Sequence, residues 1–392
     1  MADVGRNSQH ITYTENTTPS ESVKGFQGAF FYAGRNESIH MPANVTANDG
    51  HSIRIRRGII SRLGLEILRL TEDLYTEILI VTDEKVSGLY LHKVIMNFQE
   101  CPKPDGMKLR ICELIIDSHE RAKNFQTVSK LLDDMAGLGL SAKCIVVAIG
   151  GGVLCETAGF AAGCYMGGVR LVLVPTTLAA MIEASAWDSA FINLTAGKNL
   201  AGMRCRPSLV VCDTDCLSTL SQEEYRSGIA EALKTAIMSG EELFRIFERG
   251  NVRDSIEKII EGCIKYRAGL TREMKSKCLG YALGNAIESL SGYGIHHGLA
   301  LSQGIGITAR ASVKQGWCGE NTSARIINAL TRSNLPSECR SFTAGEISQA
   351  LLSGRKISGS GFDLVVPAEI GGCGAVNVPA GELEAVISSG ME

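Results

Sequence analysis

The chain has 392 residues, of which 45% are hydrophobic and 21% are charged, and its formal net charge is -3. This composition is typical of a globular protein with room for two domains, and it excludes a wholly disordered chain. The small net charge argues against nucleic acid or an anionic membrane as the main partner.

The N-terminal stretch MADVGRNSQHITYTENTTPSES is polar and lacks the apolar segment of a secretory signal. We expect residues 1–24 to form a disordered polar arm. The thirteen cysteines are odd in number, include no CxxC pair and lie largely in apolar runs. Reduced thiols and a cytoplasmic location are therefore expected.

Residues 77–178 alternate strand-like apolar runs with helical patterns. The predicted strands cover 77–86, 108–116, 143–152 and 169–178, and the predicted helices cover 89–98, 124–140 and 155–168. This alternation predicts a parallel sheet flanked by helices, which binds ligands beyond the carboxyl ends of its strands.

The run from residue 144 to residue 174 is long enough for a membrane span and carries only two charges, Glu156 and Arg170. Glu156 divides the run, glycines interrupt it, and β-branched residues crowd each end. A buried strand, helix and strand is therefore the preferred interpretation, and no membrane partner is expected.

From about Gln222 to Arg355 the periodicity is helical, and STLSQEE has the polar cap and early acids of a helix start. A second, helical domain is predicted to begin near residue 218, and the cleft between the domains is the expected place for chemistry. One or two late strands are expected within residues 361–379.

The segment AIGGGVLCETAGF predicts a strand that delivers Gly150, Gly151 and Gly152 to a helix N-terminus. There, backbone amides could approach a pyrophosphate, and the helix dipole favours its negative charge. The segment is not a GxGxxG motif, so a simple tight turn is the alternative. Thr176 and Thr177 end the next predicted strand, where their hydroxyls could reach phosphate or ribose.

The order of these pieces resembles a known family. The chain follows, over residues 53–375, the pattern of 3-dehydroquinate synthase and of its relatives, the sugar phosphate cyclases, in TDEKVSGLYL, IGGGVLCETAGF, VPTTLAAMIEAS, AGKNLAG, EYRSGIAEALKTAI and GYALGNAIESLSGYGIHHGLAL. The resemblance implies an α/β fold in which a Rossmann-like parallel-sheet NAD-binding domain (25–217) precedes an α-helical metal and substrate domain (218–392). It also implies a homodimer.

The resemblance further implies how NAD would be held. Asp83 would contact a ribose, the three glycines would lie at the pyrophosphate, and Thr176, Thr177 and Lys198 would line the dinucleotide. Glu120 and Lys123 would lie near the adenosine end, and Glu156 takes the place of the acid in the family's GGGxxGD. The position of Asp83 after a strand agrees with this role independently.

In the family, NAD oxidises one hydroxyl of a sugar phosphate, phosphate leaves, and an aldol step closes a carbocycle. A divalent metal such as Zn or Co, bound by one glutamate and two histidines, polarises the oxygen that is oxidised. The glutamate corresponds to Glu231 in AEALK, and the distal histidine corresponds to His297 in HHGL. Tyr281 and Asn285 stand where GHTxGHAxE has histidines.

Metal retention is therefore left open. Tyr281 could bind as a phenolate, but its high reference pKa makes this costly, and phenolate suits iron better than zinc. His296 is the substitute nearest in sequence, yet it could face the same ion as His297 only in an irregular loop. The alternative is a capping or core histidine without a metal.

The substrate side also departs from the family. Lys234, Lys198, Asn199, Glu183 and Arg272 are the catalytic candidates that the resemblance implies. Glu183 replaces an aspartate, Ser189 stands where a substrate-binding lysine belongs, and Gly167 replaces an arginine. These losses make an anionic substrate harder to hold by the usual contacts. The basic run KYRAGLTREMKSK retains positive charge, although each of its side chains is individually more typical of a solvated helix face.

Three functions fit these observations. The first is an NAD-dependent sugar phosphate cyclase, a carbon-oxygen lyase, that acts on a non-standard sugar phosphate in specialised metabolism. The second is an NAD-dependent oxidoreductase or epimerase that does not cyclise its substrate. The third is a nucleotide-binding pseudoenzyme. Because of the lost cations, 3-dehydroquinate synthase itself is the least favoured of the cyclases.

Overall fold

The computed structural model describes residues 43–46, 52–69, 75–101, 109–183, 188–270, 278–353, 357–358 and 361–392. The expected polar arm and the catalytic candidate Arg272 lie outside the described residues.

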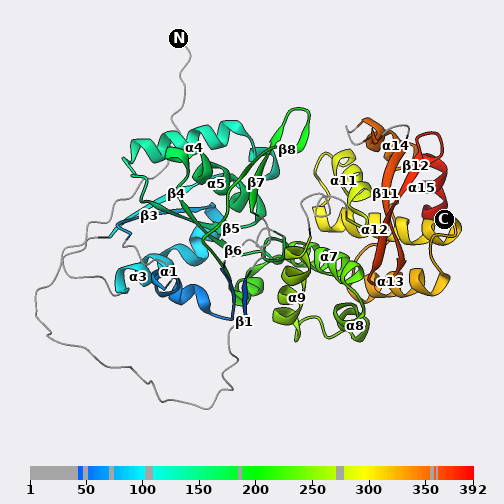
Figure 1. Cartoon of the computed structure of the whole chain (residues 1–392), viewed down its shortest axis with the longest axis horizontal. Coiled ribbons are helices and arrows are strands. Elements are labelled where there is room, and N and C mark those ends of the chain that lie inside the picture. The colour runs from blue at the N-terminus through cyan, green and yellow to red at the C-terminus, as the bar shows by residue number, and fades with distance from the viewer. Residues whose placement is uncertain are drawn as a thin grey trace, which may run out of the picture.

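One half of the molecule is built on a seven-stranded sheet (Figure 1). Six strands run parallel, and only β1 at one edge is antiparallel to its neighbour β2. The strands lie in the order β1 (Ala43–Thr46), β2 (Ser52–Ile55), β9 (Leu209–Cys212), β6 (Arg170–Pro175), β5 (Ile145–Gly150), β3 (Glu77–Thr82) and β4 (Arg110–Ile115). The predicted parallel sheet is confirmed. Every residue of the central strand β5 is buried, which explains its continuous apolar sequence IVVAIG.

Helices cover this sheet and connect its strands. The longer ones are α1 (Leu63–Leu68), α3 (His92–Glu100), α4 (Phe125–Gly137), α5 (Gly152–Cys164) and α6 (Leu178–Ile182). Short turns of helix precede or follow them, namely η1 (Ile59–Arg62), α2 (Glu84–Val86), η2 (Ser87–Leu91), η3 (Glu120–Ala122), η4 (Tyr165–Gly167) and η6 (Thr214–Thr219).

The apolar run 144–174 forms β5, α5 and β6, as predicted. Helix α5 is buried along most of its length, because it packs against the sheet at β5 and also against α4 and β7. Its small residues allow this close packing. A search of the described residues finds no helix with the length and hydrophobicity needed to cross a membrane.

The sequence did not predict the hairpin of β7 (Ser189–Leu194) and β8 (Gly197–Arg204). These antiparallel strands form a separate two-stranded sheet that packs on α5 and extends from the sheet half (Figure 1). Because the hairpin carries Lys198 and Asn199, it brings two predicted site residues beside the sheet.

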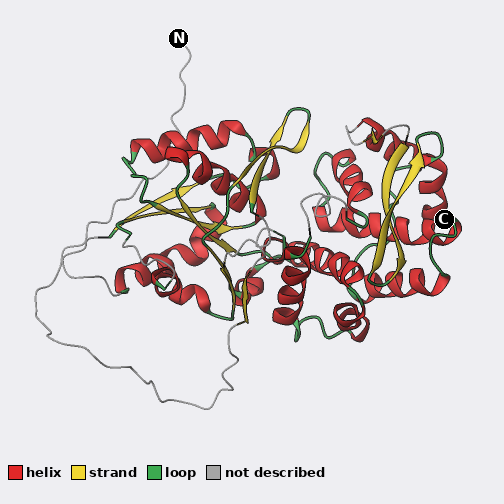
Figure 2. Cartoon of the chain, viewed as in Figure 1, coloured by secondary structure: helices red, strands yellow, loops and turns green. Residues whose placement is uncertain are grey.

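The other half is mainly helical (Figure 2). It contains α7 (Gln222–Ser239), α8 (Glu241–Arg249), α9 (Ile256–Ala268), α11 (Tyr281–Leu290), α12 (His297–Lys314), α13 (Glu320–Arg332), α14 (Ala344–Ser353) and α15 (Leu383–Met391). Helix α7 begins with a capping box of Ser221 and Glu224, which confirms the predicted helix start. A three-stranded antiparallel sheet of β10 (Ile357–Ser358), β11 (Gly361–Glu369) and β12 (Gly372–Pro379) confirms the two late strands. The domain limits at residues 24 and 217 stay predictions.

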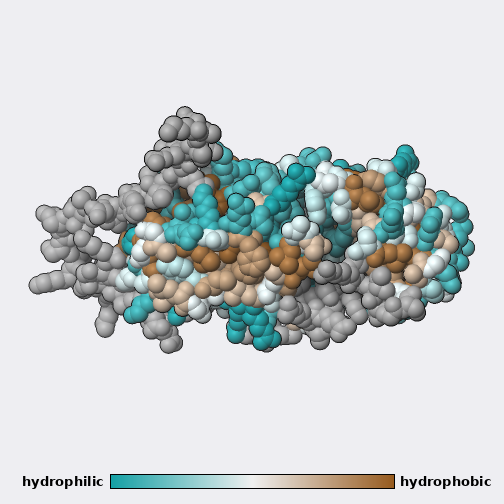
Figure 3. Space-filling model, turned by 90° about the horizontal axis from the view of Figure 1, so that it is seen from above, coloured by the Kyte–Doolittle hydropathy of each residue, from teal (hydrophilic) through white to brown (hydrophobic). Residues whose placement is uncertain are grey.

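None of the thirteen cysteines, which all lie in the described ranges, forms a disulfide, and most are buried, as expected of small hydrophobic side chains. Seen from above, one face of the molecule shows a band of hydrophobic residues (brown) with hydrophilic borders (teal) (Figure 3). The homodimer stays a prediction.

Candidate active site

A cavity of about 1320 Å³ lies at the carboxyl ends of the parallel strands. Five of the predicted cofactor-binding residues line it, namely Asp83, Gly151, Gly152, Thr176 and Thr177. They come from the ends of β3, β5 and β6, which are neighbours in the sheet. The structure therefore gathers residues that are almost a hundred positions apart in the sequence at the sheet edge where such folds bind ligands.

The glycine turn presents its backbone to this cavity. Gly151 caps the N-terminus of α5, and a Cβ atom added at Gly152 would meet nothing within 4 Å. Backbone amides at this helix N-terminus are thus free to approach an anion. Two of the polar side chains also cap helices: Asp83 Oδ1 accepts a 2.9 Å hydrogen bond from Val86 N, and Thr177 Oγ1 accepts one of 3.2 Å from Ala180 N.

A second cavity, of about 800 Å³, adjoins the first at Gly152 and Val153 and lies between the two halves. Charged and polar side chains from both halves line it, namely Glu120, Lys123, Glu156, Glu183, Lys198, Asn199, Lys234, Arg267, Tyr281, Asn285 and His297. Glu120 and Lys123, which were expected at the adenosine end of a dinucleotide, thus line this second cavity and not the one beside Asp83. Their role as NAD contacts stays a prediction.

Close packing of α12 on α7 brings His297 to Glu231. A side chain at Gly298 would collide with the Ser227 backbone, so only glycine lets the two helices approach this closely. Gly298 N also donates a 3.0 Å hydrogen bond to Ser227 Oγ. As a result His297 Nε2 lies 3.2 Å from Glu231 Oε1, as the predicted pairing of these residues requires.

The buried Glu231 carboxylate also contacts the ammonium of Lys234 on the same face of α7. Lys234 Nζ reaches Glu183 Oε1 at 2.9 Å, and Arg267 Nη1 lies 3.1 Å from the same oxygen. Burial acts to raise the pKa of Glu231, but Lys234 and His297 outweigh it and hold that pKa well below its usual range. Burial acts to lower the pKa of Lys234, but Glu183 and Glu231 outweigh it and raise that pKa.

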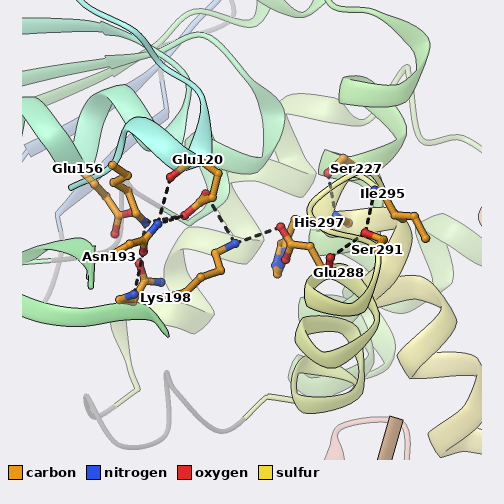
Figure 4. A network of polar contacts seen from close by, with 12 residues as sticks. Glu120, Glu156, Asn193, Lys198, Ser227, Glu288, Ser291, Ile295 and His297 are labelled. Carbon is orange, nitrogen blue, oxygen red and sulfur yellow. Dashed lines mark hydrogen bonds and ion pairs between the residues drawn. The ribbon is translucent and has the colours of Figure 1, made fainter. Parts of the chain in front are cut away.

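His297 lies between two carboxylates. Its Nδ1 is 2.8 Å from Glu288 Oε2, on the side of the ring away from Glu231. Although burial acts in the opposite direction, the carboxylates of Glu231 and Glu288 raise the pKa of His297 to about 9. Glu288 Oε1 in turn accepts a 3.1 Å hydrogen bond from Lys198 Nζ, so the hairpin and the helical half are joined by an ion pair (Figure 4).

The network continues into the sheet half (Figure 4). Lys198 Nζ and Lys123 Nζ each lie 3.6 Å from a Glu120 oxygen, and Lys123 Nζ is 2.5 Å from Glu156 Oε2 and donates to Asn199 Oδ1 at 2.6 Å. Burial raises the pKa of Glu156 in spite of Lys123. The pKa of Glu120 is lowered, because Lys123 and Lys198 outweigh burial. Acidic and basic side chains therefore alternate along this network, from Glu156 in the sheet half to His297 in the helical half.

Tyr281 and Asn285 lie one turn apart on α11 and line the same cavity. The Tyr281 ring is edge-on to the His297 ring at a centroid distance of 5.8 Å, and Lys234 Nζ lies 5.9 Å from its centroid, over the ring. The structure thus brings the three predicted metal ligands together. No three side chains of His, Cys, Asp or Glu within the described ranges are grouped so that they could hold a metal ion.

Sequence reasoning missed two contributors to this site. The basic run KYRAGLTREMKSK is typical of a solvated helix face, yet its Arg267 is only 2% exposed and lines the cavity. Glu288 was not singled out, although it orients His297 and pairs with Lys198. The signal for Glu288 was present: it is the acid of the GHTxGHAxE pattern, seven residues after Tyr281.

The fold and the two adjoining cavities define a class: an α/β sheet half with a glycine turn, joined to a helical half. This fold is shared with solved structures of cyclases. A 2-deoxy-scyllo-inosose synthase complexed with carbaglucose-6-phosphate, NAD+ and Co2+ superposes with a TM-score of 0.77 at 20% identity, over 89% of this chain and 99% of that one. A 2-epi-5-epi-valiolone synthase from Streptomyces hygroscopicus subsp. jinggangensis with NAD+ and Zn2+ bound superposes with a TM-score of 0.75 at 22% identity. The superposition covers 91% of this chain and 98% of that one.

Sequence comparison narrows the class. The profile of the 3-dehydroquinate synthase N-terminal region matches residues 113–227, and that of the C-terminal region matches residues 228–357. The 3-dehydroquinate synthase of Pelobacter propionicus is 30% identical over 358 residues, which cover 88% of this chain and 97% of that protein. The 3-dehydroquinate synthase of Desulforamulus reducens is 32% identical over 305 residues, which cover 74% of this chain and 83% of that protein. The chain belongs to the 3-dehydroquinate synthase family.

Proposed function

We propose that the protein is an NAD-dependent sugar phosphate cyclase that acts on a substrate other than that of 3-dehydroquinate synthase. The observation that carries the proposal is the junction of the two cavities at Gly152. A dinucleotide on the glycine turn would there reach a chamber lined by Lys198, Lys234 and Arg267. Family membership and the NAD-bound solved cyclases support the same conclusion.

The residues of the first cavity fit NAD. The open space at Gly152 leaves room for a pyrophosphate at the N-terminus of α5, and the Asp83 carboxylate can accept bonds from ribose hydroxyls. Thr176 and Thr177 complete the polar lining. When bound, NAD would supply a hydride acceptor for a substrate hydroxyl and return the hydride later.

The substrate would lie in the second cavity. Lys234 and Arg267 are buried cations beside Glu183, and they would attract an anionic group of the substrate. Asn285 Oδ1 is buried and has no hydrogen-bond partner among the described residues, so it is placed to accept a bond from a substrate hydroxyl. Ser189 lines the same cavity in place of the expected lysine, which supports a different substrate.

His297 is the group best placed to exchange a proton with the substrate. Glu288 fixes the ring through Nδ1, and Nε2 lies 3.2 Å from Glu231 Oε1 without a hydrogen bond between them. Because the pKa of His297 is raised to about 9, the ring is protonated at neutral pH and would donate a proton from Nε2 to a substrate oxygen. Lys234, between Glu231 and Glu183, would stabilise negative charge that develops on the substrate oxygen.

The donor set does not fit the divalent metal of the family. Of these residues, Glu231 and His297 are conventional ligands, whereas Tyr281 is a partly buried phenol and Asn285 is an amide. Burial raises the pKa of Tyr281 further above its ordinary value. The proposed chemistry is therefore derived from side chains alone, and the expected binding of a metal by Glu231, His297 and Tyr281 is not part of the proposal.

The test is to incubate the purified protein with a panel of sugar phosphates. The panel includes the acidic substrate of 3-dehydroquinate synthase, and heptose and hexose phosphates that carry no carboxylate. Released phosphate and carbocyclic product are followed by NMR, and bound NAD by its absorbance. Ring formation with phosphate release from a non-acidic sugar supports the proposal. Turnover of the acidic substrate alone would contradict the altered specificity, and NAD reduction without a ring would favour the oxidoreductase. NAD binding without turnover of any sugar phosphate would favour the nucleotide-binding pseudoenzyme, and absence of NAD binding would reject the proposal.

A further inference from the structure

The Glu231 carboxylate, where the family resemblance expects a metal ligand, is already neutralised by protein side chains. One of its oxygens contacts the Lys234 ammonium, and the other lies 3.2 Å from His297 Nε2. The Glu231 and Lys234 side chains are each 1% exposed. Lysine at this position also belongs to the family pattern, so Lys234 does not distinguish this chain from the metal-binding family members.

The difference is at residue 281. Tyr281 begins α11, and its ring lies edge-on to His297 while one ring face is turned to Lys234 Nζ. An aromatic ring thus occupies the space beside the Glu231 and His297 pair, in place of the second imidazole of the family's metal site. Catalytic zinc sites keep three protein ligands drawn from Cys, His, Asp and Glu, and a neutral phenol does not replace one of them.

The surrounding charges are also balanced without an ion. Lys234 and Arg267 offset Glu183 and Glu231, while Lys198 offsets Glu288 on the other side of His297. Glu183, Glu231 and Glu288 therefore each have a lysine ammonium as ion-pair partner, and the second Glu231 oxygen lies 3.2 Å from His297 Nε2 without a hydrogen bond. A divalent ion placed here would add two positive charges and gain only two conventional ligands.

We propose that this centre works without a divalent metal, and that the Lys234 ammonium, held between Glu231 and Glu183, provides the positive charge at the substrate oxygen. The second clause rests on the proposed function. The first concerns only the affinity of this chain for metal ions, and it can be tested whether or not the substrate is known.

The geometry also shows how a metal site would be restored. Two imidazoles bound to one zinc ion through bonds of roughly 2 Å have ring centroids roughly 5 Å apart. The Tyr281 and His297 centroids are 5.8 Å apart. A histidine at position 281 would therefore have its ring within about 1 Å of the required separation, with Glu231 as the third ligand. Tyr281→His should create a site that the natural chain lacks.

The experiment uses the full chain, treated with EDTA, dialysed and titrated with Co2+ and then Zn2+. Metal content is measured by mass spectrometry, cobalt coordination by visible absorption, and folding by circular dichroism. The natural chain and the control Tyr281→Phe should retain no stoichiometric metal after dialysis, whereas Tyr281→His should retain about one ion per chain. Its affinity for Co2+ should be higher by roughly 100-fold, and His297→Ala in that background should abolish the gain.

Retention of one Co2+ or Zn2+ by the natural chain, with loss of the ion in His297→Ala, would overturn the inference even if Tyr281→His failed to fold. So would a folded Tyr281→His variant that bound metal no better than Tyr281→Phe. NAD binding to the EDTA-treated natural chain is measured in parallel. Its absence would reject the proposed function, while the metal titration would still decide this inference separately.

Discussion

The two adjoining cavities depend on the sequence in different ways. The cavity beside Asp83 includes the glycine turn at the carboxyl ends of the parallel strands, and five of the expected cofactor-binding residues line it unchanged in type. The cavity between the halves is formed by charged side chains, and there Tyr281, Asn285 and Ser189 all depart from the family pattern. A site made of backbone survives divergence as long as the fold does, whereas a site made of side chains can change chemistry through a few substitutions.

The largest effect is expected when a buried charge of the second cavity loses its partner. Lys234→Met keeps the length of the side chain but leaves Glu231 and Glu183 without their shared cation. We expect the free energy of unfolding to fall by about 3–5 kcal/mol, measured by urea denaturation. Lys85→Met is the control, because that exposed lysine forms only a surface ion pair with Glu224; its loss should cost at most about 1 kcal/mol. An equal decrease in the free energy of unfolding of both variants would contradict the claim that the buried ion pairs of Lys234 stabilise the fold more than a surface ion pair does.

The first cavity should be sensitive to volume at the glycine turn. Gly152→Val places a side chain in open space, so the fold should be retained while the pyrophosphate position is filled. We expect NAD affinity to fall by on the order of 100-fold, or about 2.7 kcal/mol, in a calorimetric titration. Gly374→Val, on β12 and also free of nearby atoms, is the matched control and should bind NAD like the natural chain. NAD binding by Gly152→Val at full affinity would show that the dinucleotide does not lie on this turn.

The charged cavity should also make stability depend on pH. The pKa of His297 is raised from 6.5 to about 9 in the folded chain, so its stabilising effect is fully present below about pH 6.5. It is lost as the pH rises through about 9. We expect the free energy of unfolding to decrease across this window by on the order of 2 kcal/mol in metal-free buffer. His297→Gln should lack this decrease; an identical pH profile in both proteins would contradict it.

The smallest change is expected on restoring one substrate cation. Ser189→Lys places an ammonium on the wall of the second cavity, close to Arg267 and Lys234 in the same lining. Affinity for a phosphate-bearing ligand should rise by at most about tenfold, because Asp188 beside it offsets part of the new charge. Ser189→Met, with similar length and no charge, is the control. A gain in both variants would mean that side-chain size, and not charge, limits binding.

Much of the fold could be predicted because its signals are local. Continuous apolar runs such as IVVAIG indicate buried parallel strands, and the Ser221 cap marks the start of α7. The β7–β8 hairpin was missed because no residue of β8 is fully buried, so its sequence GKNLAGMR lacks the apolar run that marks the core strands. Its contribution to the site depends on tertiary packing, which no local pattern encodes.

The site could be predicted only where residue type and position in the chain were enough. Glu231, Lys234 and His297 meet as expected, because helix spacing and the family pattern place them. The burial of Arg267 could not be anticipated, since its side chain lies in a basic run typical of a solvated face. Only the folded chain shows that Glu183, from the other half, pairs with it.

Glu288 gives the molecule a means of communication between its halves. One carboxylate oxygen holds Lys198 of the hairpin, and the other holds His297 of the helical half. A ligand that drew Lys198 toward itself would leave the full negative charge of Glu288 to the imidazole and would make it a stronger base. Occupancy on the sheet side would in this way change the proton affinity of His297 through a single residue.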